Sequence, residues 1–163
     1  MNNYQLNTNW CLWYHSINDN SWKNSSYKEL YKIRNLYDLK CLNDTIKKIH
    51  LQNSMFFIMR EDIFPTWEDP DNRNGCCVSF KISSNVLDDQ WNLIINMILS
   101  EDIIKDKEKY DLITGVSISP KKEFNIVKIW LRENVSDFTE FLNEYEPFYT
   151  KKNSLIKKHE LCD

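Results

Sequence analysis

Segments of two different hydrophobic periods follow one another along the chain, and their order constrains the fold more than any other feature. Six segments have a strand pattern, in which apolar side chains alternate with polar ones or run on continuously. These segments are residues 9–16, 29–36, 55–60, 76–83, 111–119 and 124–132. The last two are separated by residues 120–123, which begin with a proline and predict a hairpin turn.

Helical spacing of apolar residues predicts three helices between and after these strands. In residues 86–100 apolar side chains recur every three or four positions, which predicts the strongest helix of the chain. Residues 38–50 have the same spacing, with Asp38 as the expected N-cap. A third helix is expected to be capped at position 136 or 137 and to end at Pro147.

This interleaving of strands and helices favours an α+β domain. We expect one curved, mostly antiparallel sheet with about three helices packed on its convex face. The concave face would stay open, and aromatic loops at its rim would make it a natural binding site. The whole chain, 1–163, is expected to be one domain, with residues 1–8 as a flexible N-terminus and 148–163 as a short, weakly patterned tail.

Net charge limits how the chain can contact nucleic acid. The 21 Lys and Arg residues are outnumbered by 24 Asp and Glu, for a formal net charge of −3. The surface as a whole therefore does not attract nucleic acid, and any contact has to be local and compact. This favours a pocket for a base or a chain end over a groove along a duplex.

The cysteines and the apolar runs bear on metal binding and location. No C-x-x-C pair is present among the five cysteines, so neither a zinc site nor another metal or cofactor is expected. The first ten residues lack the apolar segment of a signal peptide. No apolar run approaches the ~20 residues of a membrane span, so no membrane association is expected. Free thiols without a signal indicate the cytoplasm.

A loop at residues 64–75, rich in prolines and ending in Asn-Gly, contains the most specific motif. The sequence Ile-Phe-Pro-Thr-Trp-Glu-Asp at 63–69, followed by Asn72 and Gly75, resembles the signature loop of the eukaryotic translation initiation factor 4E family. Members of that family bind the 5′ cap of mRNA. The resemblance covers about residues 9–146.

The resemblance implies a role for four side chains. Trp22 and Trp67 would stack on the two faces of the 7-methylguanine base, Glu68 would bind the guanine edge, and Trp130 would contact the cap methyl group. For the tryptophans the alternative is plain packing. Trp22 and Trp67, however, lie in loops among polar residues, whereas Trp130 ends a strand where core packing is as reasonable.

The chemistry of the cap agrees with these residue types. The 7-methylguanine ring carries a positive charge, so two indole faces attract it by cation–π contact, at up to ~2 kcal/mol or more per face when water is excluded. Its edge offers two N–H donors, and a carboxylate such as Glu68 can accept both, at about 1.5–3 kcal/mol each.

The triphosphate contacts must differ from those of the family. The family's basic positions fall on Lys121, Glu123 and Ile126 in the hairpin, and a family arginine falls on Cys77. The candidate phosphate-binding residues here are Lys121, Lys122, Lys128, Arg73 and Lys152, each of which could equally be an ordinary surface residue.

The convex surface also departs from the family. The resemblance implies that a tryptophan of the first helix, which docks the scaffold factor 4G and repressors, is replaced by Asn43, and a leucine of the second helix by Asn92. Leu39 remains as one apolar contact. Loss of an aromatic anchor predicts altered docking of a scaffold of the factor 4G type.

The sequence thus predicts a monomeric protein that binds capped mRNA in translation initiation and is not an enzyme. The alternatives are a cap-sequestering regulator that does not recruit the scaffold and a general single-stranded RNA-binding protein. Catalytic motifs such as G-x-S-x-G, H-E-x-x-H and the P-loop are absent. Mg²⁺ binding by Asp69 and Asp71 is the weakest alternative.

Overall fold

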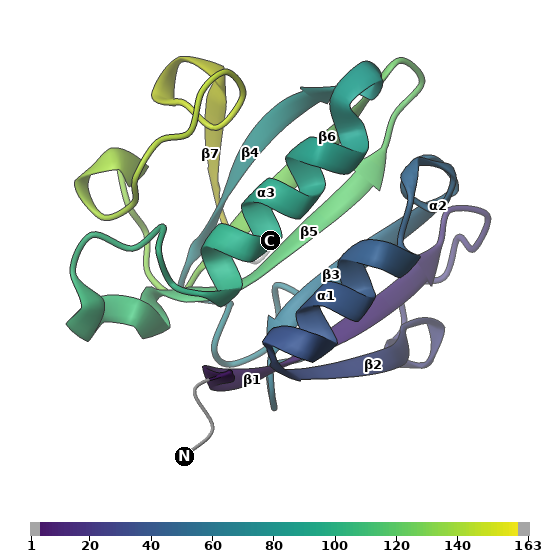
Figure 1. The fold of residues 1–163 in the computed structure, drawn as a ribbon, viewed down its shortest axis with the longest axis horizontal. Helices are drawn as coiled ribbons and strands as arrows, with labels where there is room; N and C mark the ends of the chain where they lie inside the picture. Colours follow the sequence, from purple (N-terminus) through teal and green to yellow (C-terminus); the bar gives the residue numbers. More distant parts are fainter. Residues whose placement is uncertain (1–3, 160–163) are drawn as a thin grey trace.

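The computed structural model describes residues 4–159 and is built on one seven-stranded sheet. The strand order is β2-β1-β3-β5-β6-β4-β7, and every neighbouring pair is antiparallel (Figure 1). The strands are β1 (Gln5–Ser16), β2 (Lys28–Asn35), β3 (Ser54–Arg60), β4 (Cys76–Ser83), β5 (Ile113–Pro120), β6 (Phe124–Leu131) and β7 (Ser154–Lys158).

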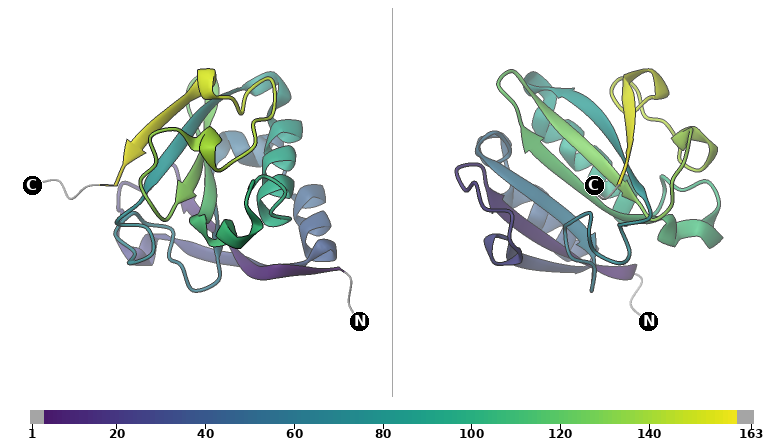
Figure 2. Two further views of the ribbon diagram at one scale, coloured as in Figure 1. Left: turned by 90° about the vertical axis from the view of Figure 1, so that its left-hand side faces the viewer. Right: turned by 180° about the vertical axis from the view of Figure 1, so that it is seen from behind.

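Three α-helices cover one face of the sheet and leave the other free of helices (Figure 2). They are α1 (Leu36–Thr45), α2 (Lys48–Asn53) and α3 (Leu87–Leu99). The main core lies between the sheet and these helices, with Trp10, Phe80 and Trp91 among its largest fully buried side chains. The predicted α+β class, with a curved antiparallel sheet and a few helices, is confirmed.

The helix predicted over 38–50 is in fact two helices, α1 and α2. Asn35, not Asp38, is the N-cap of α1, because its side chain accepts a hydrogen bond from the backbone N–H of Asp38. The helix therefore begins at Leu36, two residues before the expected cap. It ends where Ile46 takes an extended conformation, and α2 starts after Lys47.

The helix expected before Pro147 does not form. Only a 3-10 turn, Phe138–Glu140, follows the Asp137 cap. The backbone groups that would continue the helix bond instead to the segment after α3: Lys105 N–H donates to the carbonyl of Phe141, and Asn143 N–H to that of Ile103. The apolar residues of this segment therefore pack on the core from an irregular backbone and not from a helix.

Both ends of the described chain belong to the sheet. Residues 5–8, which the sequence assigned to a flexible N-terminus, are the first residues of β1, while residues 1–3 lie outside the described part. The predicted tail contains a strand, β7, that pairs with β4 at the edge of the sheet. The residues at the end of β7 are accessible from the helix-free face.

Candidate functional site

A cleft of about 260 Å³ opens on the helix-free face, where the loop before β4 meets the end of β7. The residues that line it come from that loop and from three adjacent strands. They are Trp67, Cys77, Ser79, Lys128, Trp130, Lys157, Lys158 and His159.

The loop that carries Trp67 is held by the side chain of Asn72. Asn72 is fully buried, and its Nδ2 donates to the carbonyls of Thr66, at 2.9 Å, and Phe64, at 3.3 Å. Its Oδ1 accepts from the hydroxyl of Thr114 at 2.7 Å. One buried amide thus ties the loop to itself and to β5, which fixes the half-buried Trp67 before any ligand arrives.

Gly75 lets this loop run close to the sheet. A Cβ at Gly75 would lie 1.8 Å from the carbonyl oxygen of Leu131, a backbone atom that cannot move aside. Asp69 closes the turn by accepting from the backbone N–H groups of Phe64 and Asp71. Glu68 takes no part in these bonds and is exposed beside Trp67.

Trp130 lines the floor of the cleft. It is 7% exposed and belongs to a small hydrophobic cluster on the helix-free face with Phe57 and Met59. Its indole N–H donates to the hydroxyl of Ser117 at 3.0 Å, which fixes the ring orientation. A ring that is nearly buried in the floor of a cleft can still contact a small apolar group of a ligand.

Cys77 and His159 form one wall of the cleft. Nδ1 of His159 lies 2.8 Å from the carbonyl oxygen of Asn72, which can only accept, so Nδ1 carries the hydrogen. Nε2 then accepts from the thiol of Cys77 at 3.0 Å. Burial raises the pKa of Cys77 to about 12, so the sulfur stays protonated. Burial also lowers the pKa of His159, which favours the neutral ring.

Trp22 does not line the cleft. It lies between β1 and β2, is 56% exposed, and stacks on the imidazole of His15 with ring centroids 4.2 Å apart. A chain of ring contacts runs from Trp22 through Tyr27 to Phe57 and on to Trp130. The two tryptophans proposed for stacking are therefore not brought into one cleft in this state.

Of the predicted phosphate-binding residues, the structure brings Lys128 into the cleft with Trp67. Lys121 and Lys122 are exposed in the turn between β5 and β6, and Arg73 is exposed in the loop before β4. Lys152 lines a different and larger cavity.

Lys157 is a cleft residue that sequence reasoning missed. It lies directly opposite Cys77 in the pairing of β7 with β4. Lys158, His159 and Ser79 were also missed. Ser79 alternates with Cys77 on the predicted strand 76–83, so its face could be predicted. Only knowledge that residues 154–158 form a strand beside β4 could have revealed Lys157, Lys158 and His159, and five residues carry too weak a pattern for that.

The convex surface has a polar contact where the sequence predicted lost apolar anchors. Asn43 of α1 donates through Nδ2 to Oδ1 of Asn96 of α3 at 2.9 Å, and its own Oδ1 is buried without a partner. Leu39 is buried and Asn92 is half-buried nearby on the same two helices. Exposed Leu36 borders the shallow groove between them.

Residues 4–159 contain neither a membrane-spanning helix nor a metal-binding cluster. No helix there combines the length and apolar content needed to cross a bilayer. His, Cys, Asp and Glu side chains in the same range do not gather in groups that could hold a metal ion. Cys11, Cys41, Cys76 and Cys77 are free thiols, and Cys162 lies outside the described residues.

Comparison with known sequences agrees with this geometry. A homologue of eukaryotic translation initiation factor 4E from Acanthamoeba polyphaga mimivirus is 34% identical over 91 residues, which are 56% of this chain and 33% of that protein. Initiation factor 4E-1 of Caenorhabditis elegans is 26% identical over 145 residues, 83% of this chain and 66% of that protein. The chain thus spans about a third and about two thirds of these relatives.

Solved structures share the fold. Ascaris suum factor 4E-3 in complex with the m7G cap has a TM-score of 0.72 at 20% identity, covering 84% of this chain and 78% of that one. Factor 4E-3 of C. elegans, with the 4E-binding protein Mextli and a cap analogue, has a TM-score of 0.71 at 23% identity, covering 80% and 75%. The family model described as eukaryotic initiation factor 4E matches residues 5–154, and the chain therefore belongs to this family.

Proposed function

We propose that this protein binds the 7-methylguanosine cap of mRNA, acts in translation initiation, and works in the cytoplasm as a monomer. The observation that carries the proposal is the cleft in which Trp67 and Trp130 lie together with Lys128 and Lys157. Relatives solved with the m7G cap and with a cap analogue support it.

Trp67 and Glu68 would recognise the base. The charged 7-methylguanine ring gains cation–π attraction on the indole face of Trp67, and the attraction is lost when the methyl group and its charge are absent. Glu68 is exposed and free of loop bonds, so its carboxylate is available to both N–H donors of the guanine edge. Trp130, on the floor, would meet the methyl group.

Trp22 would supply the second stacking face. His15 covers one face of its indole, and the exposed fraction of 56% indicates that the other face is open. Because Trp22 does not line the cleft, the loop between β1 and β2 must close toward Trp67 when the base enters. Residues 18–21 are not buried, so apart from the contact of Ser21 with His15 few contacts oppose this movement.

Lys128 and Lys157 would hold the triphosphate. Cys77 stands at a position where the family resemblance implies an arginine, and Lys157 is its direct cross-strand neighbour. Lys128 lies two pairs further along the ladder between β4 and β6, opposite Ser79. The strands on either side of β4 would therefore supply the positive charge that β4 lacks. Both lysines would lie along the path of the triphosphate, which extends away from the bound base.

The protein is proposed to bind its ligand without transforming it. The thiol–imidazole contact in the cleft resembles a nucleophile and base, but burial raises the pKa of Cys77 to about 12. A thiol that stays protonated is a poor nucleophile. The contact instead fastens the end of β7 to β4, while Nδ1 of His159 holds the loop that carries Trp67 through the carbonyl of Asn72.

The test is titration with 7-methyl-GTP and GTP, followed by tryptophan fluorescence. The wild type should bind the methylated nucleotide far more tightly. Trp67→Ala should weaken binding by about 1–3 kcal/mol, the value of one base stack. Glu68→Gln should weaken it by about 1.5–3 kcal/mol. Tyr37→Ala, on the convex side, is the matched aromatic control and should change nothing. Equal affinity for both nucleotides would overturn the proposal.

Uncapped RNA separates this function from general single-strand binding. A general binder would keep its affinity when the cap is removed and would lose it steeply as salt is raised. The proposed function requires the reverse, with cap-dependent affinity that survives moderate salt.

A cap-sequestering role is the second candidate, favoured by the contact between Asn43 and Asn96. Two amides occupy the convex groove where an aromatic anchor would make docking strong, so a scaffold of the factor 4G type would bind weakly or by a different motif. Affinity purification of the wild type and of Asn43→Trp would separate the roles. Recovery of a scaffold by the wild type supports initiation, whereas recovery by the variant alone supports sequestration.

A further inference from the structure

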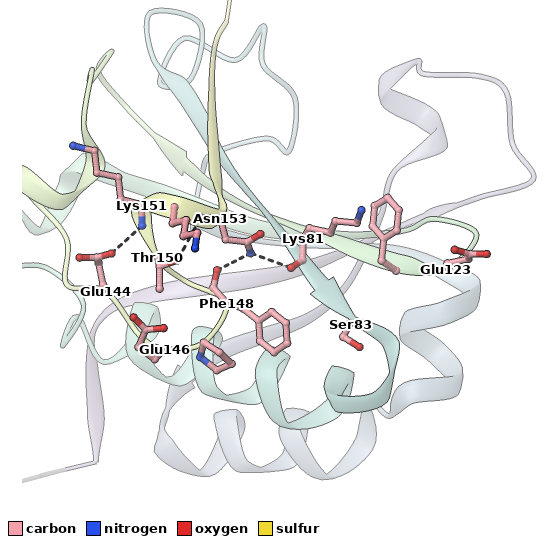
Figure 3. A pocket seen from close by; sticks show the side chains of 12 residues that line it. Lys81, Ser83, Glu123, Glu144, Glu146, Phe148, Thr150, Lys151 and Asn153 are labelled. Atoms are coloured by element: carbon pink, nitrogen blue, oxygen red, sulfur yellow. Dashed lines mark hydrogen bonds between the residues drawn. The ribbon is translucent and has the colours of Figure 1, made fainter.

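A second hollow lies on the same sheet, beyond the candidate cap cleft. It is an open cavity of about 1160 Å³ at the edge of β4, beyond the point where β7 begins its pairing (Figure 3). Lys81 and Glu123 lie on one side of it, and Glu144 and Lys151 lie across from them. Phe124 also lines it, with the ammonium of Lys81 4.1 Å from the centre of its ring.

The strand register connects this cavity to the cap cleft along one face. Trp130, Lys128, Ile126 and Phe124 alternate along β6 and therefore share the helix-free face. Lys81 is the cross-strand neighbour of Ile126 and joins the same row. From Trp130 to Phe124 the row is six residues, or ~20 Å at ~3.3 Å per residue. A base on Trp130, a triphosphate at Lys128 and a following nucleotide at Phe124 occupy such a length in order.

We propose that Lys81 and Phe124 form a subsite for the first nucleotides of the RNA that follow the cap. The inference rests on the proposed cap binding and adds the single-stranded RNA body to the ligand. Phe124 offers an aromatic surface on which a base can stack, and Lys81 offers a cation for the adjoining phosphate. This pairing of aromatic ring and cation is how sequence-tolerant single-strand sites are built.

The charges around the cavity show which interaction dominates. Glu144 accepts from the backbone N–H of Lys151, whose ammonium is paired with Asp137 at 2.6 Å, so these groups are engaged with one another. The remaining lysines of the lining, Lys81 and Lys152, are matched by Glu123 and Glu146, which leaves little excess positive charge. Stacking on Phe124 therefore outweighs phosphate attraction, and the RNA contribution should depend only weakly on salt.

The experiment compares two ligands: 7-methyl-GTP and a capped RNA of about eight nucleotides. The wild type should bind the capped RNA at least about fivefold more tightly than the nucleotide, the low end of one stacked base. Phe124→Ala should remove most of that gain and Lys81→Gln a smaller part of it, and both variants should leave 7-methyl-GTP affinity unchanged. Lys40→Gln, an exposed lysine of α1, should keep the gain.

Three results would overturn the subsite. These are no gain for capped RNA in the wild type, a full gain retained by both variants, or an equal loss of affinity for both ligands. The last would place Lys81 and Phe124 in the cap site itself. If 7-methyl-GTP is bound no better than GTP by the wild type, the failure belongs to the proposed cap binding instead.

Discussion

The imidazole of His15 lies flat against the indole of Trp22, with their planes within 9° of parallel. Nδ1 of His15 is 2.9 Å from the carbonyl oxygen of Ser16, and Nε2 is 2.8 Å from that of Ser21. His15 is itself fully buried. Ser16 is the last residue of β1 and Ser21 lies in the loop that follows, so the ring connects this loop to the sheet and sets the plane of Trp22, which stands outside the cleft.

We predict that His15→Ala weakens 7-methyl-GTP binding by about 1 kcal/mol, because Trp22 loses the surface that orders it. The measurement is a double-mutant cycle with Trp22→Ala. If His15 acts through Trp22, its substitution has no further effect once the indole is gone. Additive losses would show that His15 acts only on the fold.

Lys157→Gln and Lys128→Gln should each weaken 7-methyl-GTP binding by about 1 kcal/mol, since each removes a cation from the phosphate side of the cleft. Binding of 7-methylguanosine, which has no phosphates, should stay the same. Lys122→Gln, in the turn between β5 and β6, is the control. An equal effect of Lys122→Gln would place the phosphates nearer the turn.

Acid should weaken the docking of β7 through His159. Burial lowers its pKa below the ordinary 6.5, so the unfolded chain binds more protons than the folded one. The contribution of His159 to stability is complete above pH 6.5 and declines as the pH falls from there through the lower folded value. We expect urea denaturation to show a larger loss of stability between about pH 7.5 and about pH 5 in the wild type than in His159→Gln. Parallel losses would contradict this.

Gly75→Ala should destabilise the fold by about 1–3 kcal/mol, since the added methyl group meets the carbonyl of Leu131. The loop would have to move away from the sheet and take Trp67 with it, so cap affinity should fall as well. Asn74→Ala, at the exposed neighbouring position, is the control and should change stability by no more than about 0.5 kcal/mol. An unchanged denaturation midpoint in Gly75→Ala would show that the loop yields easily.

Long segments with a regular period were predictable from the sequence, and the fold class followed from their order. The strands around Trp10 and Trp130 and the helix around Trp91 are present where apolar spacing placed them. Strand β7 was not predictable, because in five residues its outward side chains include Leu155, which is 70% exposed. The order of apolar and polar residues in the sequence therefore does not identify residues 154–158 as a strand.

The residues of the candidate site also differ in whether the sequence could identify them. Trp67 and Glu68 could be singled out because a local motif contains them. Lys157 and His159 could not, since their places depend on pairing between strands about 80 positions apart in the sequence. Such contacts are set by register, which one sequence does not specify when a strand is short and polar on both faces.

The edge position of β7 makes the phosphate side of the cleft the part of the sheet that can open with the least disruption. Among the described strands, β7 pairs with β4 alone, whereas β4 also pairs with β6. If β7 separates from β4, Lys157 leaves the cleft and Cys77 loses the imidazole beside it, while the other six described strands stay paired. Local opening at this edge would therefore remove the proposed phosphate contacts before the domain unfolds.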